Sequence, residues 1–311
     1  SRSLIGKHAQ IQKEMNNAVI GAFLTGICSE QPSFINELLD SPKFYKEIEK
    51  NLGATINQIT TGAFKKMTFS FPKQDEQTNI GNYFQQLDKL IEQKEKKYQK
   101  LKQFKKAMLD KMFPKNGADT PEIRFKGFSG KWEEKSLSEI GEIVTGSTPS
   151  TQEPLNYSID GIPWVTPTDI SENITLFTSR HLSLKGQSIA RIVPKDTILV
   201  TCIASIGKNT LLGTIGSFNQ QINGLIPNKE KYNSYFLFTE STIWSNNMKK
   251  IAASGTMQII NKKEFSELKT YIPKKEEQEK IGNYFQKLDK QINLQQKELE
   301  KLKNIKKASL A

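Results

Sequence analysis

A long charged segment occurs twice in the chain. Residues 80–109 read IGNYFQQLDKLIEQKEKKYQKLKQFKKAML, and residues 281–310 read IGNYFQKLDKQINLQQKELEKLKNIKKASL, a displacement of 201 positions (281 minus 80). Shorter matches at the same displacement pair 71–77 with 272–278 and 4–11 with 205–212, and a weaker match pairs 62–67 with 263–268. Internal repeats constrain architecture more than any local pattern does. The sequence therefore predicts a globular piece followed by a helix, present about twice, with the front of the first copy missing.

The repeated segments have the apolar spacing of a coiled-coil seam, with intervals of three, four and seven residues. The predicted helix-pairing residues are Ile80, Phe84, Leu87, Ile91, Tyr98 and Leu101 in the first copy, and Ile281, Phe285, Leu288, Ile292, Leu299 and Leu302 in the second. Lys94 and Gln295 occupy one equivalent seam position, where a polar residue helps to fix the register. A generic dimerising coiled coil gives the same pattern. Two equivalent seams in one chain instead favour antiparallel pairing about a pseudo-two-fold axis, which makes the helices a spacer between two like modules.

Between the helices the sequence has a different texture, with fewer charges and more Ser, Thr, Gly and β-branched residues. Short apolar runs bounded by turn residues predict strands at 141–146, 163–166, 190–194 and 196–203. Residues 234–252 have the spacing of a helix, and 41–52 are the predicted counterpart of that helix in the first copy. The predicted fold class is α+β, with mixed α/β modules joined by long antiparallel coiled-coil helices in a pseudo-two-fold repeat.

The formal net charge is +12 in 311 residues, an excess that favours an anionic partner such as nucleic acid. Charge alone does not decide between such a partner and a protein that is simply soluble and lysine-rich. Cys28 and Cys202 stand too far apart in sequence to suggest a disulfide framework or a zinc site. The sequence has no apolar run long enough for a membrane span and no signal peptide, so an intracellular, cytoplasmic protein is expected. Because the first residue is not Met, the chain is interpreted as a fragment or a processed product.

The sequence lacks the motifs of common enzymes. The segment CIASIGKNT at 202–210 has Cys202 where a phosphate-binding loop requires glycine, and Asn209 where it requires Ser or Thr. No glycine-rich cofactor fingerprint and no segment typical of adenine methylation is present. His8 and His181 are the only histidines, and neither has a partner set that would support nucleophilic catalysis. We therefore expect no catalytic residue, no metal site and no cofactor in this chain.

Polar loops of the central region suit contact with DNA, because amides can pair with adenine in the major groove while lysines and hydroxyls bind phosphates. For each loop taken singly, an ordinary turn or cap is the favoured interpretation, and only for the loop at 217–224 are the two interpretations balanced. The predicted DNA-contacting residues are Ser147, Thr148, Ser150, Thr166, Thr168, Lys208, Asn219, Gln220, Gln221, Asn223, Thr256 and Gln258, with Lys7, Lys13, Asn16 and Asn17 in the first copy.

Taken together, these segments resemble the specificity subunit of type I restriction–modification systems. The resemblance is carried by PEIRFKGFSGKWEEKSLSEIGEIVTGSTPST at 121–151, IPWVTPTDI at 162–170, SIGK at 205–208, FNQQING at 218–224, SGTMQIINKKEF at 254–265 and IPKKEEQEKIGNYFQKLDKQI at 272–292. It implies the C-terminal part of a first target-recognition domain at 1–72, a helical region at 73–113, a second target-recognition domain at 114–273 and a second helical region at 274–311.

The resemblance also implies a function and partners. Such a subunit is non-catalytic and reads a two-part target in double-stranded DNA, one part with each recognition domain. Its helices set the gap between the parts and help to bind two modification subunits, which use S-adenosylmethionine. Restriction subunits that use ATP and Mg²⁺ can join them, and no membrane is involved. Two other hypotheses remain open, namely a helical assembly protein whose modules bind protein and a nucleic-acid enzyme with an unrecognised site.

Overall fold

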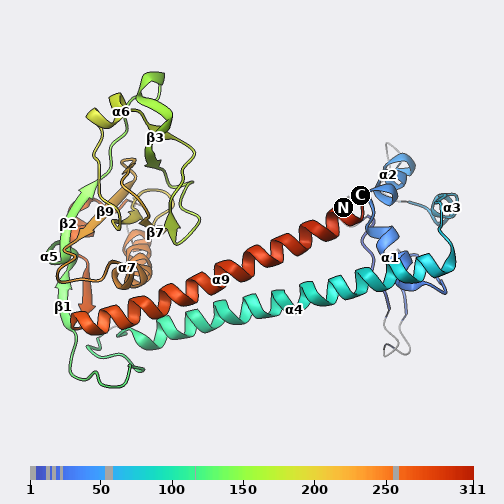
Figure 1. Cartoon of the computed structure of the whole chain (residues 1–311), viewed down its shortest axis with the longest axis horizontal. Helices are drawn as coiled ribbons and strands as arrows, with labels where there is room; N and C mark the ends of the chain where they lie inside the picture. Colours follow the sequence, from blue (N-terminus) through green and yellow to red (C-terminus); the bar gives the residue numbers. More distant parts are fainter. Residues whose placement is uncertain are drawn as a thin grey trace. The chain divides into compact units, whose positions relative to one another are not determined.

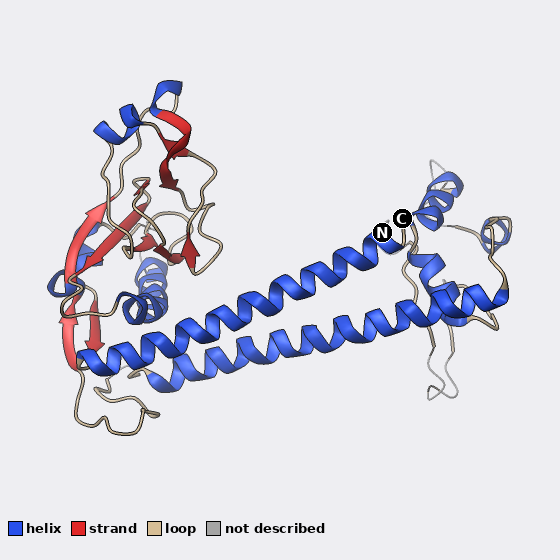
Figure 2. Cartoon of the chain, in the orientation of Figure 1, coloured by secondary structure: helices blue, strands red, loops and turns tan. Residues whose placement is uncertain are grey.

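The structure is a computed structural model. It describes residues 5–11, 15, 19–21, 24–52, 59–115, 117–254 and 259–311. The chain divides into two compact units, Ser1–Lys100 with Asn293–Ala311 (unit 1) and Leu101–Ile292 (unit 2). The mixture of helix and sheet joined by long helices confirms the predicted α+β class. All strands of the described residues lie in unit 2, as Figure 2 shows.

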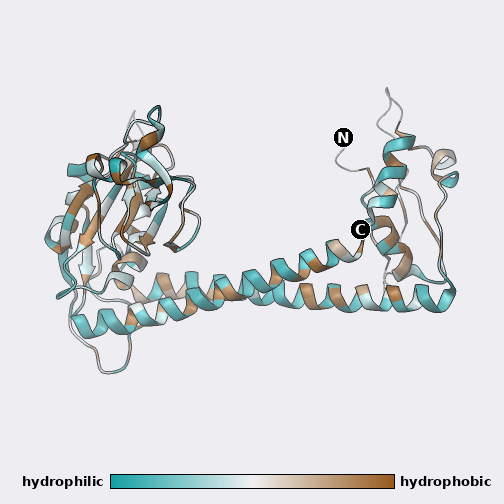
Figure 3. Cartoon of the chain, turned by 45° about the horizontal axis from the view of Figure 1, so that its top comes forward, coloured by the Kyte–Doolittle hydropathy of each residue, from teal (hydrophilic) through white to brown (hydrophobic). Residues whose placement is uncertain are grey.

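The described residues of unit 1 form three short helices and parts of the two long helices (Figure 1). Their bounds are α1 Pro32–Asp40, α2 Pro42–Asn51, α3 Thr61–Lys65, α4 Gln74–Met112 and α9 Lys275–Ser309. Both long helices continue into unit 2. Apolar residues recur along each of them among the charged ones (Figure 3). Asp75 and Glu76 stand in the first turn of α4, and Glu276 and Glu277 in the first turn of α9, where acidic side chains complement the helix dipole.

Within unit 1 the segments of α4 and α9 run antiparallel. Lys94 Nζ lies 2.6 Å from Glu298 Oε2. Farther along, the earlier residue Asp88 pairs with the later residue Lys306, with both carboxylate oxygens 2.8 Å from Nζ. Because residue numbers fall on one helix as they rise on the other, the pairing is head to tail.

The same direction is found within unit 2. Lys105 Nζ on α4 lies 2.5 Å from Asp289 Oδ1 on α9. At the end of α4, the ring of Phe113 lies against Phe285, with centroids 5.8 Å apart. These contacts also pair rising with falling residue numbers, so both units contain an antiparallel pair of helix segments.

The repeat extends to details of the helix starts. Gln77 Nε2 donates to the carbonyl of Pro72 at 2.8 Å, and Gln278 Nε2 donates to the carbonyl of Pro273 at 2.9 Å. Each side chain thereby ties the first turn of its helix to the proline before it. One turn later, a Cβ on Gly81 would lie 3.0 Å from the backbone of α1. The corresponding glycine of α9 meets α7 at the same distance in unit 2.

One difference between the two copies of the repeat is that one long helix of unit 2 corresponds to two short helices of unit 1. Helix α7, Ser234–Ser254, is continuous, whereas α1 ends at Asp40 and α2 begins at Pro42. Proline cannot donate a backbone hydrogen bond within a helix but fits its first turn. Ser41 lies between the two helices and its hydroxyl accepts the amide of Phe44 at 3.3 Å, which caps α2.

Where the structure describes unit 2, its strands form three sheets with helices around them. Their elements are β1 Glu133–Ser136, α5 Leu137–Ile140, β2 Gly141–Thr145, η2 Pro154–Asn156, β3 Tyr157–Val165, β4 Ile174–Thr175, β5 His181–Leu182, α6 Leu184–Ile189, β6 Ile198–Thr201, β7 Asn209–Leu212, β8 Ser217–Phe218, β9 Ile222–Pro227, α7, α8 Lys262–Glu267 and β10 Lys269–Ile272. The main sheet has the order β2-β9-β6-β7-β4. It is antiparallel except for β4 and β7. A second sheet has the order β5-β3-β8, and β1 pairs with β10.

Among the described residues of unit 2, the buried apolar side chains form two clusters. The larger cluster joins α7 and the main sheet to the end of α4, and includes the fully buried Trp244, Phe236 and Phe285. The smaller cluster lies between the main sheet and β8, around Phe218 and Leu199. The polar loops that follow the strands are thereby fixed to a rigid base.

One expected strand is wrong. Residues 190–194 form only a single bridge, between Val193 and Gly216. Pro194 lacks the amide hydrogen that a continuing ladder needs, and Arg191 and Ile192 face solvent instead of a core. The segment is therefore a connection between α6 and β6.

Candidate nucleic-acid interface

Two polar loops of unit 2 are joined edge to edge, the one after β2 and the one between β8 and β9. The amide of Ser147 donates to the carbonyl of Phe218 at 2.8 Å, and the Thr148 hydroxyl donates to Gln220 Oε1. Gly146 permits this approach, because a Cβ there would lie 2.1 Å from the carbonyl oxygen of Asn219. The exposed side chains of Thr148 and Gln220 are thus held next to each other.

Arg191 belongs to the same group of loops, although the sequence analysis did not select it. Its amide donates to Ser147 Oγ at 2.8 Å, and its Nη1 donates to the carbonyl of Thr145 at 2.5 Å. The residue is exposed, so a fixed guanidinium lies beside the hydroxyls of this loop. The only sequence signal was a basic residue in a segment whose apolar neighbours suggested a strand.

A third loop follows β3 and is organised by Asp169. Its Oδ2 accepts the Thr166 amide at 2.9 Å and the Thr166 hydroxyl at 2.6 Å. Its Oδ1 accepts the amide of Ser179 at 2.9 Å. Burial alone would raise the pKa of Asp169, but the hydrogen bonds from Thr166 and Ser179 outweigh it and hold the pKa below its usual value. Asp169 therefore remains charged and fixes the loop, while the neighbouring Thr168 is exposed.

Lys208 adds a positive charge to this third loop. Its Nζ lies 3.2 Å from the carbonyl of Pro167, and the residue is exposed. The third loop also adjoins the second, because the amide of Asn219 donates to the carbonyl of Val165 at 2.9 Å. The exposed residues Thr148, Gln220, Thr168 and Lys208 therefore stand on loops that are hydrogen-bonded to one another.

The remaining predicted residues of these loops have internal partners. Asn219 Nδ2 donates to Gln221 Oε1 at 3.0 Å, and the amide of Gln221 donates back to Asn219 Oδ1 at 3.2 Å. Asn223 is 3% exposed, accepts the Thr145 hydroxyl at 2.7 Å and lies 3.3 Å from Cys202 Sγ. Both ends of the Asn223 side-chain amide therefore have partners within the fold. Ser150 is exposed on the first loop, and its backbone carbonyl accepts a hydrogen bond from Asn156 Nδ2 at 3.1 Å.

Other candidates lie elsewhere or outside the description. Lys7 is exposed in unit 1. Lys13, Asn16, Asn17, Thr256 and Gln258 lie outside the residues that the structure describes. The helix-pairing candidates are all buried or half-buried on α4 and α9, and they comprise Ile80, Phe84, Leu87, Ile91, Tyr98, Leu101, Ile281, Phe285, Leu288, Ile292, Leu299 and Leu302. At the polar seam position, Lys94 and Gln295 both reach Glu298 Oε2, at 2.6 and 3.1 Å.

The described residues offer no chemistry typical of a metal enzyme. They contain no group of three or more His, Cys, Asp or Glu residues that could hold a metal ion. Burial raises the pKa of the Cys202 thiol to about 12, so it is not a thiolate nucleophile. In the same described ranges, no helix has the length and apolarity to cross a bilayer.

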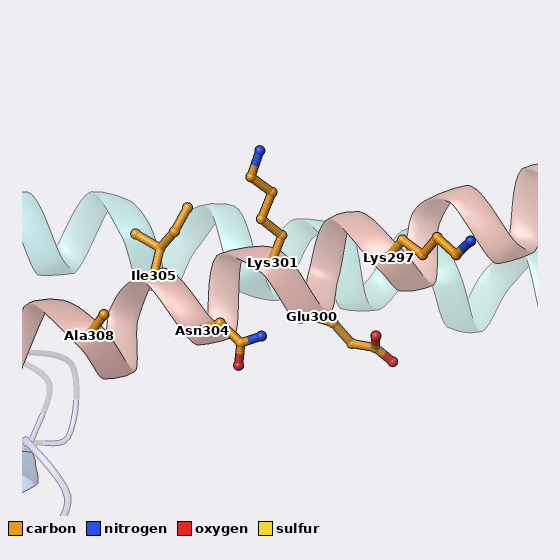
Figure 4. A pocket seen from close by; sticks show the side chains of 6 residues that line it. All are labelled: Lys297, Glu300, Lys301, Asn304, Ile305 and Ala308. Carbon is orange, nitrogen blue, oxygen red and sulfur yellow. The ribbon is translucent and has the colours of Figure 1, made fainter. Parts of the chain in front are cut away.

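A hollow of about 460 Å³ lies along one face of α9 in unit 1. Figure 4 shows that the labelled side chains all come from this single helix. They are Lys297, Glu300, Lys301, Asn304, Ile305 and Ala308. An open furrow on one helix does not enclose a small molecule, so it is a poor candidate for a catalytic site.

Comparison with known proteins agrees with this geometry. Residues 2–103 and 129–304 match the family described as "Type I restriction modification DNA specificity domain". The chain belongs to this family. It is 32% identical over 182 residues to the type I restriction enzyme MjaIX specificity subunit of Methanocaldococcus jannaschii, covering 56% of this chain and 41% of that protein. It is 30% identical over 165 residues to the HindI specificity subunit of Haemophilus influenzae, covering 50% and 36%. The chain thus spans about two fifths of the length of these curated relatives.

Solved structures show the same fold at low identity. The S subunit of a type I restriction-modification system from M. genitalium superposes with a TM-score of 0.65 at 18% identity, covering 90% of this chain and 71% of that chain. The HsdS subunit from Thermoanaerobacter tengcongensis gives a TM-score of 0.53 at 17% identity, covering 90% and 68%.

Proposed function

We propose that this chain is a DNA sequence-recognition subunit of a type I restriction–modification enzyme. The observation that carries the proposal is the joined set of polar loops in unit 2, which stands within a region that matches the specificity family. Exposed amides and hydroxyls supply hydrogen bonds for base edges, and Lys208 and Arg191 supply charge for phosphates. The net charge of +12 adds sequence-independent attraction to DNA.

We further propose that recognition is divided between two modules, each of which reads one half of a split target. The repeated helix starts in the two units support this division, because equivalent attachments call for equivalent modules. The long helices then set the gap between the two half-sites. The same helices carry the modification subunits, and restriction subunits join the assembly.

In this proposal the chain catalyses nothing and binds no cofactor. Methyl transfer with S-adenosylmethionine and DNA cleavage with ATP and Mg²⁺ belong to the partner subunits, which place the assembly in the cytoplasm with the DNA. The described residues of this chain contribute position and selectivity.

The test is a selection of bound duplexes from a random pool by the full chain, purified together with its modification subunits. The proposal predicts enrichment of two short fixed blocks separated by a gap of fixed length. Recovery of duplexes with no shared block would overturn it and would favour a helical assembly protein. Methyl transfer by this chain alone would instead favour an enzyme.

A further inference from the structure

Phe177 is an exposed aromatic residue beside the loops described above. It lies between β4 and β5, and 83% of it is exposed. The preceding Leu176 is also exposed, at 49%, and exposed apolar side chains are common on protein surfaces and prove nothing by themselves. Phe177 is distinguished by its position next to the polar loops, because it lies two residues before Ser179, whose amide binds Asp169.

The backbone that carries Phe177 is held at both ends. After it, the amide of Ser179 donates to Asp169 Oδ1 at 2.9 Å, and the carbonyl of Arg180 accepts the amide of Trp164 at 3.1 Å. Before it, the carbonyl of Thr175 accepts the amide of Gly213 at 2.8 Å. The ring is therefore presented to solvent from a fixed loop, and binding would cost little ordering of this segment.

The neighbouring groups define what such a ring would add. Asp169 joins the loop of Phe177 to the loop of Thr166 and Thr168, and Lys208 reaches the same loop through Pro167. All of these neighbours bind by hydrogen bonds or charge. The 5-methyl group of thymine is the one apolar feature of the base edges in the major groove, and a phenylalanine ring is a suitable partner for it.

We propose that Phe177 contacts a thymine methyl group in the half-site read by unit 2 and selects an A·T pair there. The inference rests on the proposed DNA-reading function. It assigns a specificity-determining role to a residue outside the polar loops. The alternative action of an exposed ring, insertion between base pairs, would unstack the duplex and is an outcome of the test.

The experiment uses the selected duplex, in which each thymine of the half-site is replaced in turn by deoxyuridine. This change removes one methyl group and nothing else. Wild-type protein should lose about three- to fivefold in affinity at one position, the effect of one buried methyl group. Phe177→Ala should bind the thymine and deoxyuridine duplexes equally, and Phe177→Leu should keep part of the discrimination. Leu184→Ala, which changes an equally exposed apolar residue on α6 (85%), should discriminate like the wild type.

The outcomes separate this inference from the proposed function. If wild-type protein selects no common sequence, the proposed function fails. If it selects one, three results overturn the role of Phe177 alone: Phe177→Ala discriminates at every thymine as the wild type does, the half-site contains no A·T pair, or 2-aminopurine fluorescence next to the contact rises on binding. The last result would indicate insertion of the ring between base pairs.

Discussion

Lys105 Nζ lies 2.5 Å from Asp289 Oδ1, and the equivalent positions of the repeat, Lys306 and Asp88, are joined at 2.8 Å. One ion pair thus occurs once in each unit with the roles of the two helices exchanged.

The side chains around the two ion pairs differ. In unit 2, Asp289 also accepts the hydroxyl of Tyr235 at 2.9 Å. Burial and the charge of Asp289 raise the pKa of Tyr235, which keeps it a donor. In unit 1, Lys306 lies 3.2 Å from the buried Glu37. Desolvation lowers the pKa of Lys306, but Asp88 and Glu37 more than offset that effect.

The pair in unit 2 should stabilise that unit. Asp289→Asn leaves the Lys105 ammonium, only 19% exposed, without its counter-charge, and should lower the free energy of unfolding by roughly 2–4 kcal/mol. The measurement is urea unfolding followed by tryptophan fluorescence. All three tryptophans of the chain lie in unit 2, so the signal reports that unit.

A matched control is Glu267→Gln, which removes an acid from an exposed ion pair with Lys263 at 3.9 Å. Its unfolding midpoint should stay at the wild-type value, because exposed pairs contribute little. Adding Lys105→Met to Asp289→Asn should recover part of the loss, since no unpaired charge then remains. Equal midpoints for Asp289→Asn and Glu267→Gln would refute a stabilising role of the pair.

A buried acid on α7 should make the stability of unit 2 depend on pH. Glu240 is 3% exposed, and its Oε1 accepts the Thr270 hydroxyl at 2.6 Å. Burial raises the pKa of Glu240 from 4.5 to about 8, against a smaller opposite effect of Thr270. The folded state therefore binds the proton more tightly than the unfolded state. The free energy of unfolding should fall as pH rises from about 4.5 to about 8, by up to about 1.4 kcal/mol per unit of pKa difference.

Glu240→Gln mimics the protonated acid and should flatten this dependence, with higher stability than the wild type near pH 8. The readout is the urea midpoint at a series of pH values. Glu142→Gln, a change of an exposed acid on β2, should retain the wild-type profile. If the Glu240→Gln variant follows the wild-type curve, Glu240 is not the group that titrates.

Gln220 and Asn223 should separate DNA reading from folding. Gln220→Ala removes an exposed amide and should weaken discrimination at one base pair by about 1–3 kcal/mol, with an unchanged unfolding midpoint. Asn223→Ala removes the partner of the Thr145 hydroxyl and should lower stability by about 1–3 kcal/mol. Binding to a panel of single-base variants and urea unfolding provide the two readouts. A uniform loss over all duplexes for Gln220→Ala would mean that it only supports the loop.

The repeat and the helices were predictable because their signal is periodic and local. Seam residues such as Phe84 and Phe285 recur at fixed intervals, and glutamines 77 and 278 stand at equivalent positions. The sequence did not predict strand order, since pairings such as β6 with β9 depend on contacts far apart in the chain. The failed strand at 190–194 shows the same limit, because apolar composition does not decide whether a partner strand is in reach.

For the interface, residue type indicated the right loops but not the direction of each side chain. Asn219, Gln220, Gln221 and Asn223 form one polar run, yet only Gln220 is exposed and Asn223 is buried. The difference comes from tertiary contacts: Asn219 and Gln221 bind each other in the loop before β9, and Asn223 lies on β9 with both faces of the strand covered. No sequence motif marked Arg191 or Phe177 as part of the interface. Their positions follow from hydrogen bonds to Ser147 and near Asp169, which only the folded chain brings together.

Lengthening both helices together should change the gap between half-sites. A heptad inserted after Tyr98 in α4 and another before Gln296 in α9 preserves the antiparallel seam, because Tyr98 and Gln296 lie side by side at 3.3 Å. Seven residues add about 10 Å of helix, so the preferred gap should grow by about three base pairs. Selection of bound duplexes measures the gap. A heptad in only one helix breaks the pairing and serves as the control, and an unchanged gap in the doubly extended protein would refute the spacer role.

The most direct test of sequence reading by unit 2 is the affinity of the assembled full chain for its selected duplex, compared with a duplex whose block for unit 2 is scrambled. Both affinities should fall steeply between about 50 and 200 mM salt. Their ratio should remain large throughout, on the order of a thousandfold or more. A ratio near one at every salt concentration would contradict the account.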